Sequence, residues 1–159
     1  MPGVTLTVGN TAVEWYAAAW RETDAAARRT LLDTCWAEDG VYCDPLNPVE
    51  GRDGLSSLIG SFQEENPGAR IDVVSGVDEH DGYLRFAWRM LAADGSVAVE
   101  GTDFGEVDGE GTLRRIVGFF GPLPGGAGRL SAAWTARPTP AFRSCRSASA
   151  GPQRRPSAS

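Results

Sequence analysis

The sequence predicts an α+β domain, in which three helices are followed by a run of antiparallel strands that form one curved sheet. Before residue 66, apolar residues recur at the spacing of a helix face, and after residue 70 they alternate with polar residues, as on a half-buried strand. The dipeptide Asp94-Gly95, between two alternating segments, is a strong hairpin signal. At 159 residues the chain suits one domain with a real core and is short for two.

Three apolar stripes predict the helices. The first covers residues 12–20. The second begins after a capping residue, Thr23 or Asp24, and its apolar face extends to Trp36. The third covers residues 53–65 and ends at an Asn-Pro-Gly sequence, which stops helices.

Strands are expected in five places. Residues 41–44 form a short one, because Pro45 disfavours helix at Asp44 and keeps that residue extended. The polar segment 78–82 is expected to be a turn. The alternation of apolar and polar residues predicts the remaining strands at residues 71–77, 83–92, 96–107 and 112–121.

The charge of the chain changes sign after residue 121. Residues 1–121 hold all 21 acidic residues and nine arginines, a net charge of −12, whereas residues 122–159 hold six arginines and no acidic residue. We expect residues 1–121 to be the folded domain. Its negative charge disfavours nucleic acid or an anionic membrane as a partner.

Residues 122–159 are rich in proline, glycine, serine, alanine and arginine and show no periodicity. This composition predicts a disordered basic tail. The alternative is that Trp134 and Phe142 dock on the acidic domain.

The remaining composition indicates a cytoplasmic protein. No apolar run is long enough to span a bilayer, and residues 1–10 lack the features of a secretory signal. The three cysteines, Cys35, Cys43 and Cys145, have neither the number nor the spacing of a disulfide framework or a zinc site. The chain has no lysine, and its arginine, alanine and glycine content suggests a GC-rich bacterial genome.

Asp103 is the first candidate for a functional residue. Strand alternation places it in phase with Val97, Val99 and Gly101, on the face that we expect to point at the helices. A carboxyl group in an apolar wall has a raised pKa, because burial disfavours its charged form. Such a group is either hydrogen-bonded for structural reasons or functional. If the alternation is out of phase, Asp103 lies on the solvent side instead.

Asp44 and Tyr16 are weaker candidates. Asp44 ends a strand before a Pro- and Gly-rich loop, where an aspartate often serves only the turn. Tyr16 lies on the apolar face of the first helix, where it can be a core aromatic with its hydroxyl at an edge. His80, the only histidine, lies in the polar turn, and a single histidine without clustered ligands predicts no metal site.

Two segments carry a resemblance to a known superfamily. The stretch Trp-Ala-Glu-Asp-Gly-Val-Tyr-Cys-Asp-Pro at residues 36–45, with Gly51 and a helix after it, resembles the start of nuclear transport factor 2-like enzymes. The same holds for Gly-Thr-Asp-Phe at residues 101–104, for the turn at 108–111 and for the strand that follows. The resemblance covers about residues 10–121. It implies a cone-shaped sheet with the three N-terminal helices on its concave face.

Ketosteroid isomerase is the closest mechanistic template in that superfamily. The resemblance implies that Asp44, in its Asp-Pro pair, is the general base, and that Asp103 and Tyr16 form the oxyanion hole. The positions that correspond to the supporting tyrosines of the isomerases are Trp36 and Ile59, and neither can accept a hydrogen bond from Tyr16. The SnoaL-like polyketide cyclases, which use a pocket carboxylate as general acid and base, are the second template.

We therefore expect a cofactor-independent isomerase or polyketide-type cyclase, without a metal, that acts on a small hydrophobic carbonyl compound. A lyase or a hydrolase of the same fold stays open. The alternative is a non-catalytic ligand-binding or dimerisation module. We expect a homodimer through the outer sheet face, which carries Arg85, Arg89, Glu100 and Glu106. The residues expected to line the substrate pocket are Trp20, Leu84, Phe86, Trp88 and Met90.

Overall fold

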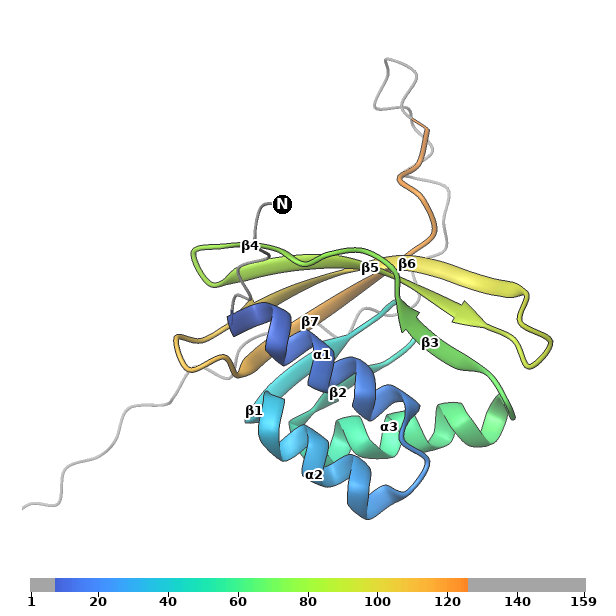
Figure 1. Cartoon of the computed structure of the whole chain (residues 1–159), viewed down its shortest axis with the longest axis horizontal. Coiled ribbons are helices and arrows are strands. Elements are labelled where there is room, and N and C mark those ends of the chain that lie inside the picture. Colours follow the sequence, from blue (N-terminus) through green and yellow to red (C-terminus); the bar gives the residue numbers. More distant parts are fainter. Residues whose placement is uncertain (1–7, 126–159) are drawn as a thin grey trace, which may run out of the picture. The chain divides into compact units, whose positions relative to one another are not determined.

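The computed structural model describes residues 8–125, and the predicted tail lies outside the described residues from residue 126 onward. The helices are α1 (Val8–Arg21), α2 (Ala25–Cys35) and α3 (Gly51–Glu65). The strands are β1 (Trp36–Cys43), β2 (Pro48–Glu50), β3 (Arg70–Val73), β4 (Asp78–His80), β5 (Tyr83–Leu91), β6 (Val97–Val107) and β7 (Leu113–Phe120). The predicted α+β class is confirmed, because three helices pack on one side of a curved, unclosed sheet (Figure 1).

The sheet follows the order β2-β1-β7-β6-β5-β3, and β4 also pairs with β5. One prediction about it is wrong: the sheet is mixed, because β1 runs parallel to β7. The pairing joins segments more than 70 residues apart, with Tyr42 opposite Ile116. A parallel pair needs a long crossover connection, here formed by α3 and the strands after it, and no local sequence pattern reports such a connection.

Several local assignments also differ from the prediction. β3 ends at Val73, whereas the strand was expected to cover residues 71–77. Trp36 is the first residue of β1 and caps α2 with its N–H on the carbonyl oxygen of Leu32, so the strand begins earlier than expected. Residues 78–80, expected to be part of a turn, pair with the start of β5. The short strand β2, which was not predicted, pairs with the end of β1. β3 and β4 therefore cover successive parts of the same edge of β5.

Polar contacts at the helix ends hold the three helices together. Asp24 caps α2 as predicted, since its side chain accepts a hydrogen bond from the N–H of Ala27 at 2.8 Å. Arg28 is 5% exposed and donates to the carbonyl of Glu22 at 2.9 Å and to the side chain of Gln63 at 3.1 Å. Gln63 in turn donates to the carbonyl of Trp20 at 3.1 Å, so α1, α2 and α3 are fixed relative to one another.

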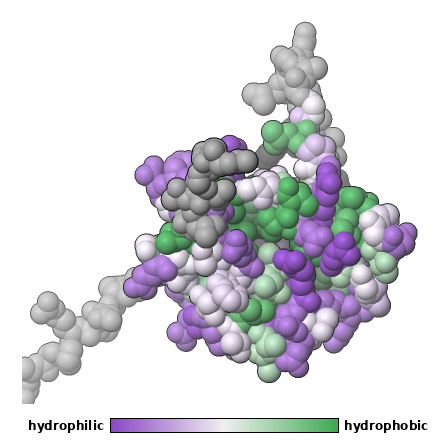
Figure 2. Space-filling view, in the orientation of Figure 1, coloured by the Kyte–Doolittle hydropathy of each residue, from purple (hydrophilic) through white to green (hydrophobic). Residues whose placement is uncertain are grey.

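The core lies between the helices and the inner face of the sheet. Its fully buried side chains include Leu32, Trp36, Leu55, Ile59 and Ile116. On the face drawn in Figure 2, hydrophilic and hydrophobic residues are mixed, as is usual for the surface of a folded domain. Within residues 8–125, none of the helices is long and apolar enough to cross a membrane.

Candidate functional site

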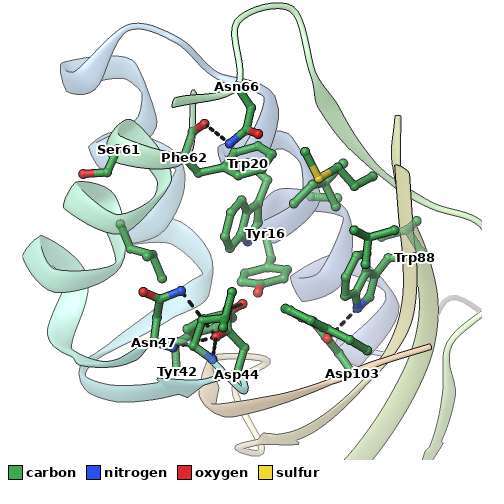
Figure 3. A pocket seen from close by; sticks show the side chains of 18 of the residues that line it. Tyr16, Trp20, Tyr42, Asp44, Asn47, Ser61, Phe62, Asn66, Trp88 and Asp103 are labelled. Atoms are coloured by element: carbon green, nitrogen blue, oxygen red, sulfur yellow. Dashed lines mark hydrogen bonds between the residues drawn. The ribbon is translucent and has the colours of Figure 1, made fainter. Parts of the chain in front are cut away.

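A cavity of about 330 Å³ lies between helices α1 and α3 and the sheet. Its lining is mostly apolar and aromatic, with a few polar groups that converge on it, which is the usual make-up of a ligand site. Figure 3 shows Tyr16, Tyr42, Asp44 and Asp103 together at one end of the cavity, and Ser61, Phe62 and Asn66 at the other. The exposed members of the lining, which mark its mouth, are Leu46, Ser61, Glu65 and Phe120.

Asp103 projects from β6 into this cavity and is 5% exposed. The indole N–H of Trp88, on the neighbouring strand β5, donates to Oδ1 of Asp103 at 2.7 Å. Burial raises the pKa of Asp103 to about 7; the Trp88 hydrogen bond lowers the pKa, and the charge of Asp44 raises it. Asp103 is therefore a carboxyl group that changes its protonation state near neutral pH.

Glycines on the inner face of the sheet make room for Asp103. A methyl group added at Gly101 would lie 2.5 Å from the Trp88 ring, so the indole lies directly over the backbone of this residue. At Gly105, an added methyl group would meet Leu84 and Ile116 at 2.9 Å and 2.8 Å. The sequence Gly-x-Asp-x-Gly thus places the carboxyl group and its indole partner where larger side chains could not coexist with them.

Asp44 follows the last residue of β1 and is held by the loop after it. Its Oδ1 accepts hydrogen bonds from the N–H groups of Leu46 and Asn47, each at 2.7 Å, and a longer one from the Asn47 amide at 3.4 Å. Its Oδ2 accepts a hydrogen bond from the hydroxyl of Tyr42 at 2.9 Å. Asp44 therefore serves the turn, as its position before Pro45 suggested, and also lines the cavity.

The two carboxyl groups reach the cavity from either side of Gly118 on β7. Asp103 is the register partner of Gly118, and Cys43, just before Asp44, pairs with the residue before Gly118. A methyl group added at Gly118 would lie 3.1 Å from Oδ1 of Asp103 and 3.4 Å from Cβ of Asp44. The parallel pairing of β1 with β7 is thus the feature that brings the two carboxyl groups together.

Two tyrosines complete this end of the cavity. Tyr16 of α1 is 4% exposed, and burial, followed by the charge of Asp103, raises its pKa well above the usual value. Tyr42 of β1 is 6% exposed, and its pKa is raised by burial and then by the charge of Asp44. Both hydroxyls therefore stay protonated at neutral pH and can act as hydrogen-bond donors.

Comparison with known proteins assigns the family. A family model of the SnoaL-like domain matches residues 12–116. The chain belongs to the SnoaL-like family. Its fold is similar to that of a SnoaL-like protein from Agrobacterium tumefaciens for which isomerase activity has been suggested. The two share 35% identity over 74% of this chain and all of the other, with a TM-score of 0.69.

More distant solved structures show the same fold. A protein with a ketosteroid isomerase-like fold from Catenulispora acidiphila, solved in complex with trimethylamine, is 17% identical over 68% of this chain and 83% of its own, with a TM-score of 0.55. A suggested polyketide cyclase from Sinorhizobium meliloti is 14% identical over 69% of this chain and 94% of its own, also with a TM-score of 0.55. At these identities the likeness concerns the fold alone. None of the curated proteins matches the sequence.

In this SnoaL-like chain, Tyr16, Asp44 and Asp103 all line one cavity, so the three candidate catalytic residues are brought together. Tyr42 was missed by the sequence reasoning. Its strand was expected because Pro45 keeps Asp44 extended, and the contact of the Tyr42 hydroxyl with Asp44 is visible only in three dimensions. One feature of the sequence could have indicated this contact. Tyr42 and Asp44 are two residues apart in an extended segment, so their side chains lie on the same face.

Four of the five predicted pocket residues line the cavity: Trp20, Phe86, Trp88 and Met90. The prediction for Leu84 is wrong. Leu84 lies on the same face of β5 as Phe86 but is 2% exposed, packs in the core and is not part of the cavity lining. Alternation identifies the face of a strand and not how far along the strand the cavity extends.

Three further residues considered from the sequence are Trp36, Ile59 and His80. Trp36 stacks on Tyr16, with ring centroids 5.8 Å apart and an interplanar angle of 18°, and Ile59 is fully buried. His80 is exposed beside Asp81, away from the cavity. Across residues 8–125, no group of three or more histidine, cysteine, aspartate or glutamate residues is placed to hold a metal ion.

Proposed function

We propose that this SnoaL-like protein is an acid/base enzyme, an isomerase or a polyketide-type cyclase, that acts on a small hydrophobic carbonyl compound. The observation that carries the proposal is the pairing of Asp103, with a pKa of about 7, and Asp44 in one apolar cavity. A group that titrates near the working pH is the most effective proton donor or acceptor. Two carboxyl groups in different surroundings can divide the two roles between them.

The hydrogen bonds of Asp44 support its role as the base. Oδ1 accepts three hydrogen bonds, whereas Oδ2 accepts only that of Tyr42 and keeps a lone pair for a proton. In the proposed first step, Oδ2 takes a proton from the carbon beside the substrate carbonyl. The C–H electron pair then forms the double bond of an enolate, whose negative charge lies on the carbonyl oxygen.

Protonated Asp103 and Tyr16 are the proposed donors to that oxygen. The Trp88 indole occupies Oδ1 of Asp103, so the proton is carried on Oδ2. Donors already in place in a water-poor site stabilise a developing oxyanion without reorganisation. An isomerase would return the proton from Asp44 to a different carbon. A cyclase would let the enolate carbon attack a second carbonyl, whose oxygen takes a proton from Asp103.

Exchange of protons into deuterated water tests this mechanism without knowledge of the natural substrate. Wild-type protein is expected to accelerate the loss of the α-proton signals of small hydrophobic ketones and diketones in proton NMR spectra. Asp44→Asn is expected to reduce this rate by about 10²- to 10⁴-fold, because the base is lost. Asp103→Asn is expected to reduce it as well, with the fold retained.

The rival function is ligand binding without chemistry. It predicts that ketones which raise the melting temperature undergo no exchange with wild-type protein. Exchange rates that are equal in wild type, Asp44→Asn and Asp103→Asn would contradict the proposed mechanism. Glu64→Gln, an exposed carboxyl group of α3 outside the cavity lining, is the matched control and is expected to exchange protons like wild type.

We also propose that the protein forms a homodimer through the outer face of the sheet. Three aromatic residues, Tyr83, Phe104 and Phe119, are 46%, 37% and 59% exposed. Each is next in its strand to a residue of the inner face, so its side chain lies on the outer face of the sheet. The rings of Tyr83 and Phe104 stack with centroids 5.8 Å apart. Exposed aromatic side chains that gather on one surface are typical of an interface.

Sedimentation of the full chain tests this dimer. Wild type is expected to sediment as a dimer at micromolar concentration, and Phe104→Glu as a monomer, because the new charge would be buried without a partner. The arginine–glutamate pairs of this face, Arg89 with Glu100 and Arg115 with Glu106, lie within one chain and are left intact. A monomeric wild type, or a dimeric Phe104→Glu variant, would show that this face is not the interface.

A further inference from the structure

The cavity holds acidic side chains and no basic one. Its lining includes the carboxyl groups of Asp44, Glu65 and Asp103, and no arginine, lysine or histidine. In the part of the chain that the structure describes, none of these three forms an ion pair. A carboxylate in a cavity of low polarity is stabilised when an opposite charge comes close. The negative charge of the cavity is therefore not balanced by the protein, and a positively charged ligand can balance it.

None of the described arginines lines the cavity. On the outer surface, some acidic residues have arginine partners, such as Asp39 with Arg114 at 3.2 Å and Asp78 with Arg85 at 2.8 Å. Arg28, the buried arginine of the helices, donates to a backbone carbonyl and to neutral side chains and is also outside the lining. The arginines of the described domain therefore leave the charge of the cavity unbalanced.

Aromatic rings add a second attraction for a positive charge. Trp20 lies next to Tyr16, Tyr42 and Phe62, with ring centroids 6.3, 5.9 and 5.7 Å away and interplanar angles between 52° and 76°. All four of these aromatic residues line the cavity. The negative face of an aromatic ring attracts an ammonium group, most strongly where water is excluded.

The end of the cavity opposite Asp103 is suited to such a group. Figure 3 shows Ser61, Phe62 and Asn66 there, on the last turns of α3 and just beyond it. Glu65 is the last residue of this helix and lines the mouth. The C-terminal pole of a helix is negative and favours a cation, and α3 has no basic residue in its last turn.

We propose that the substrate of this cavity carries a protonated amine, which lies near Trp20, Phe62 and Glu65 while its reactive carbonyl lies at Asp44 and Asp103. The inference rests on the proposed function, which places the reactive carbonyl at Asp44 and Asp103. It names the chemical class of the substrate: a lipophilic amine with a carbonyl group, and not a carboxylate, a phosphate ester or another anion. A cavity of about 330 Å³ suits a compound of roughly 10 to 20 non-hydrogen atoms.

Three probes with one hydrocarbon skeleton test the charge preference by titration calorimetry at pH 7.5. They are 4-phenylbutylamine, 4-phenylbutanol and 4-phenylbutanoate, which differ mainly in carrying a positive, a neutral or a negative end group. The full-length wild type is expected to bind the amine about tenfold more tightly than the alcohol, or better, and the carboxylate more weakly than either. Glu65→Gln is expected to weaken amine binding about threefold to fivefold and to leave alcohol binding unchanged.

Glu64→Gln is the matched control, because it removes a carboxyl group one residue away that does not line the cavity. It is expected to bind all three probes like wild type. Carboxylate binding as tight as amine binding would overturn the proposal. Amine binding that is the same in Glu65→Gln as in wild type would overturn the placement of the ammonium group.

The outcome is distinct from that of the proton-exchange experiment. Binding does not require turnover, so a preference for the amine with no exchange of α-protons would refute the proposed catalysis and retain the recognition of a cation. Exchange that depends on Asp44, together with binding of the anionic probe, would refute the amine and retain the catalysis.

Discussion

Asp103→Asn is expected to remove most of the loss of stability that the wild-type protein suffers between pH 4 and pH 7. The ordinary pKa of an aspartate is near 4, and burial raises that of Asp103 to about 7 in the folded protein. As the pH rises through this window, the unfolded chain releases the proton before the folded one does. The free energy of unfolding therefore falls, by about 4 kcal/mol once the pH exceeds the folded pKa.

The asparagine variant has no proton to release at this position. Its free energy of unfolding should therefore not show this decrease between pH 4 and pH 7. Its Oδ1 can still accept the Trp88 hydrogen bond, but its Nδ2 brings a donor into the apolar wall. We therefore expect an offset of about 1 to 3 kcal/mol that is the same at every pH. Urea unfolding of wild type and variant at pH 4.5 and at pH 8 measures the difference.

The control for this comparison is Glu64→Gln, an exposed carboxyl group whose loss should leave the pH dependence of wild type unchanged. The expected result is that the stability of Asp103→Asn relative to wild type increases by several kcal/mol from pH 4.5 to pH 8. A difference that stays constant across this range would mean that Asp103 is ionised in the folded protein at low pH, contrary to the pKa argument.

Gly101→Ala is expected to destabilise the domain by about 3 kcal/mol and to disturb the site at the same time. The added methyl group would overlap the Trp88 ring, 2.5 Å and 2.8 Å away, and also the backbone carbonyl oxygen of Phe119. The indole can turn away, but the carbonyl belongs to the adjacent strand β7 and cannot move without a shift of the sheet. Overpacking of this kind usually costs about 1 to 3 kcal/mol, and more where backbone must move.

Gly118→Ala is the matched control for this prediction. Its methyl group would lie 3.1 Å from Oδ1 of Asp103 and 3.4 Å from Cβ of Asp44, which is tight but without overlap of backbone. We expect it to lower the free energy of unfolding by about 1 kcal/mol or less. Equal unfolding free energies for Gly101→Ala and Gly118→Ala in urea titrations would contradict the seating of the indole on Gly101.

The fold and part of the site could be predicted from the sequence because they depend on local patterns. Alternation along residues 96–107 placed Asp103 on the inner face, and a run of apolar residues at helical spacing placed Tyr16 on the inner face of α1. The parallel pairing of β1 with β7 could not be predicted in this way, because it joins residues 36–43 to residues 113–117. The spacing of apolar and polar residues within one segment does not indicate which distant strand that segment pairs with.

The same limit explains the errors at the site. Leu84 shares its strand face with Phe86, but the cavity ends before it, and its extent depends on how the helices pack. Tyr42 was expected only to belong to the strand at residues 41–44, although its hydroxyl donates a hydrogen bond to Asp44. The network at the carboxyl end is thus a product of tertiary packing between α1, β1, β5, β6 and β7, whereas its separate members can be found in the sequence.

The account depends most on the claim that burial, with a smaller contribution from the charge of Asp44, makes Asp103 titrate near neutral pH. A carbon-13 NMR titration of the aspartate carboxyl signals, assigned through Asp103→Asn, measures this directly. The account predicts a pKa of about 7 in wild type, a lower pKa in Asp44→Asn, where the neighbouring charge is lost, and a higher one in Trp88→Phe, where the hydrogen bond to the charged form is lost. An Asp103 pKa near 4 in wild type, unchanged in both variants, would contradict it.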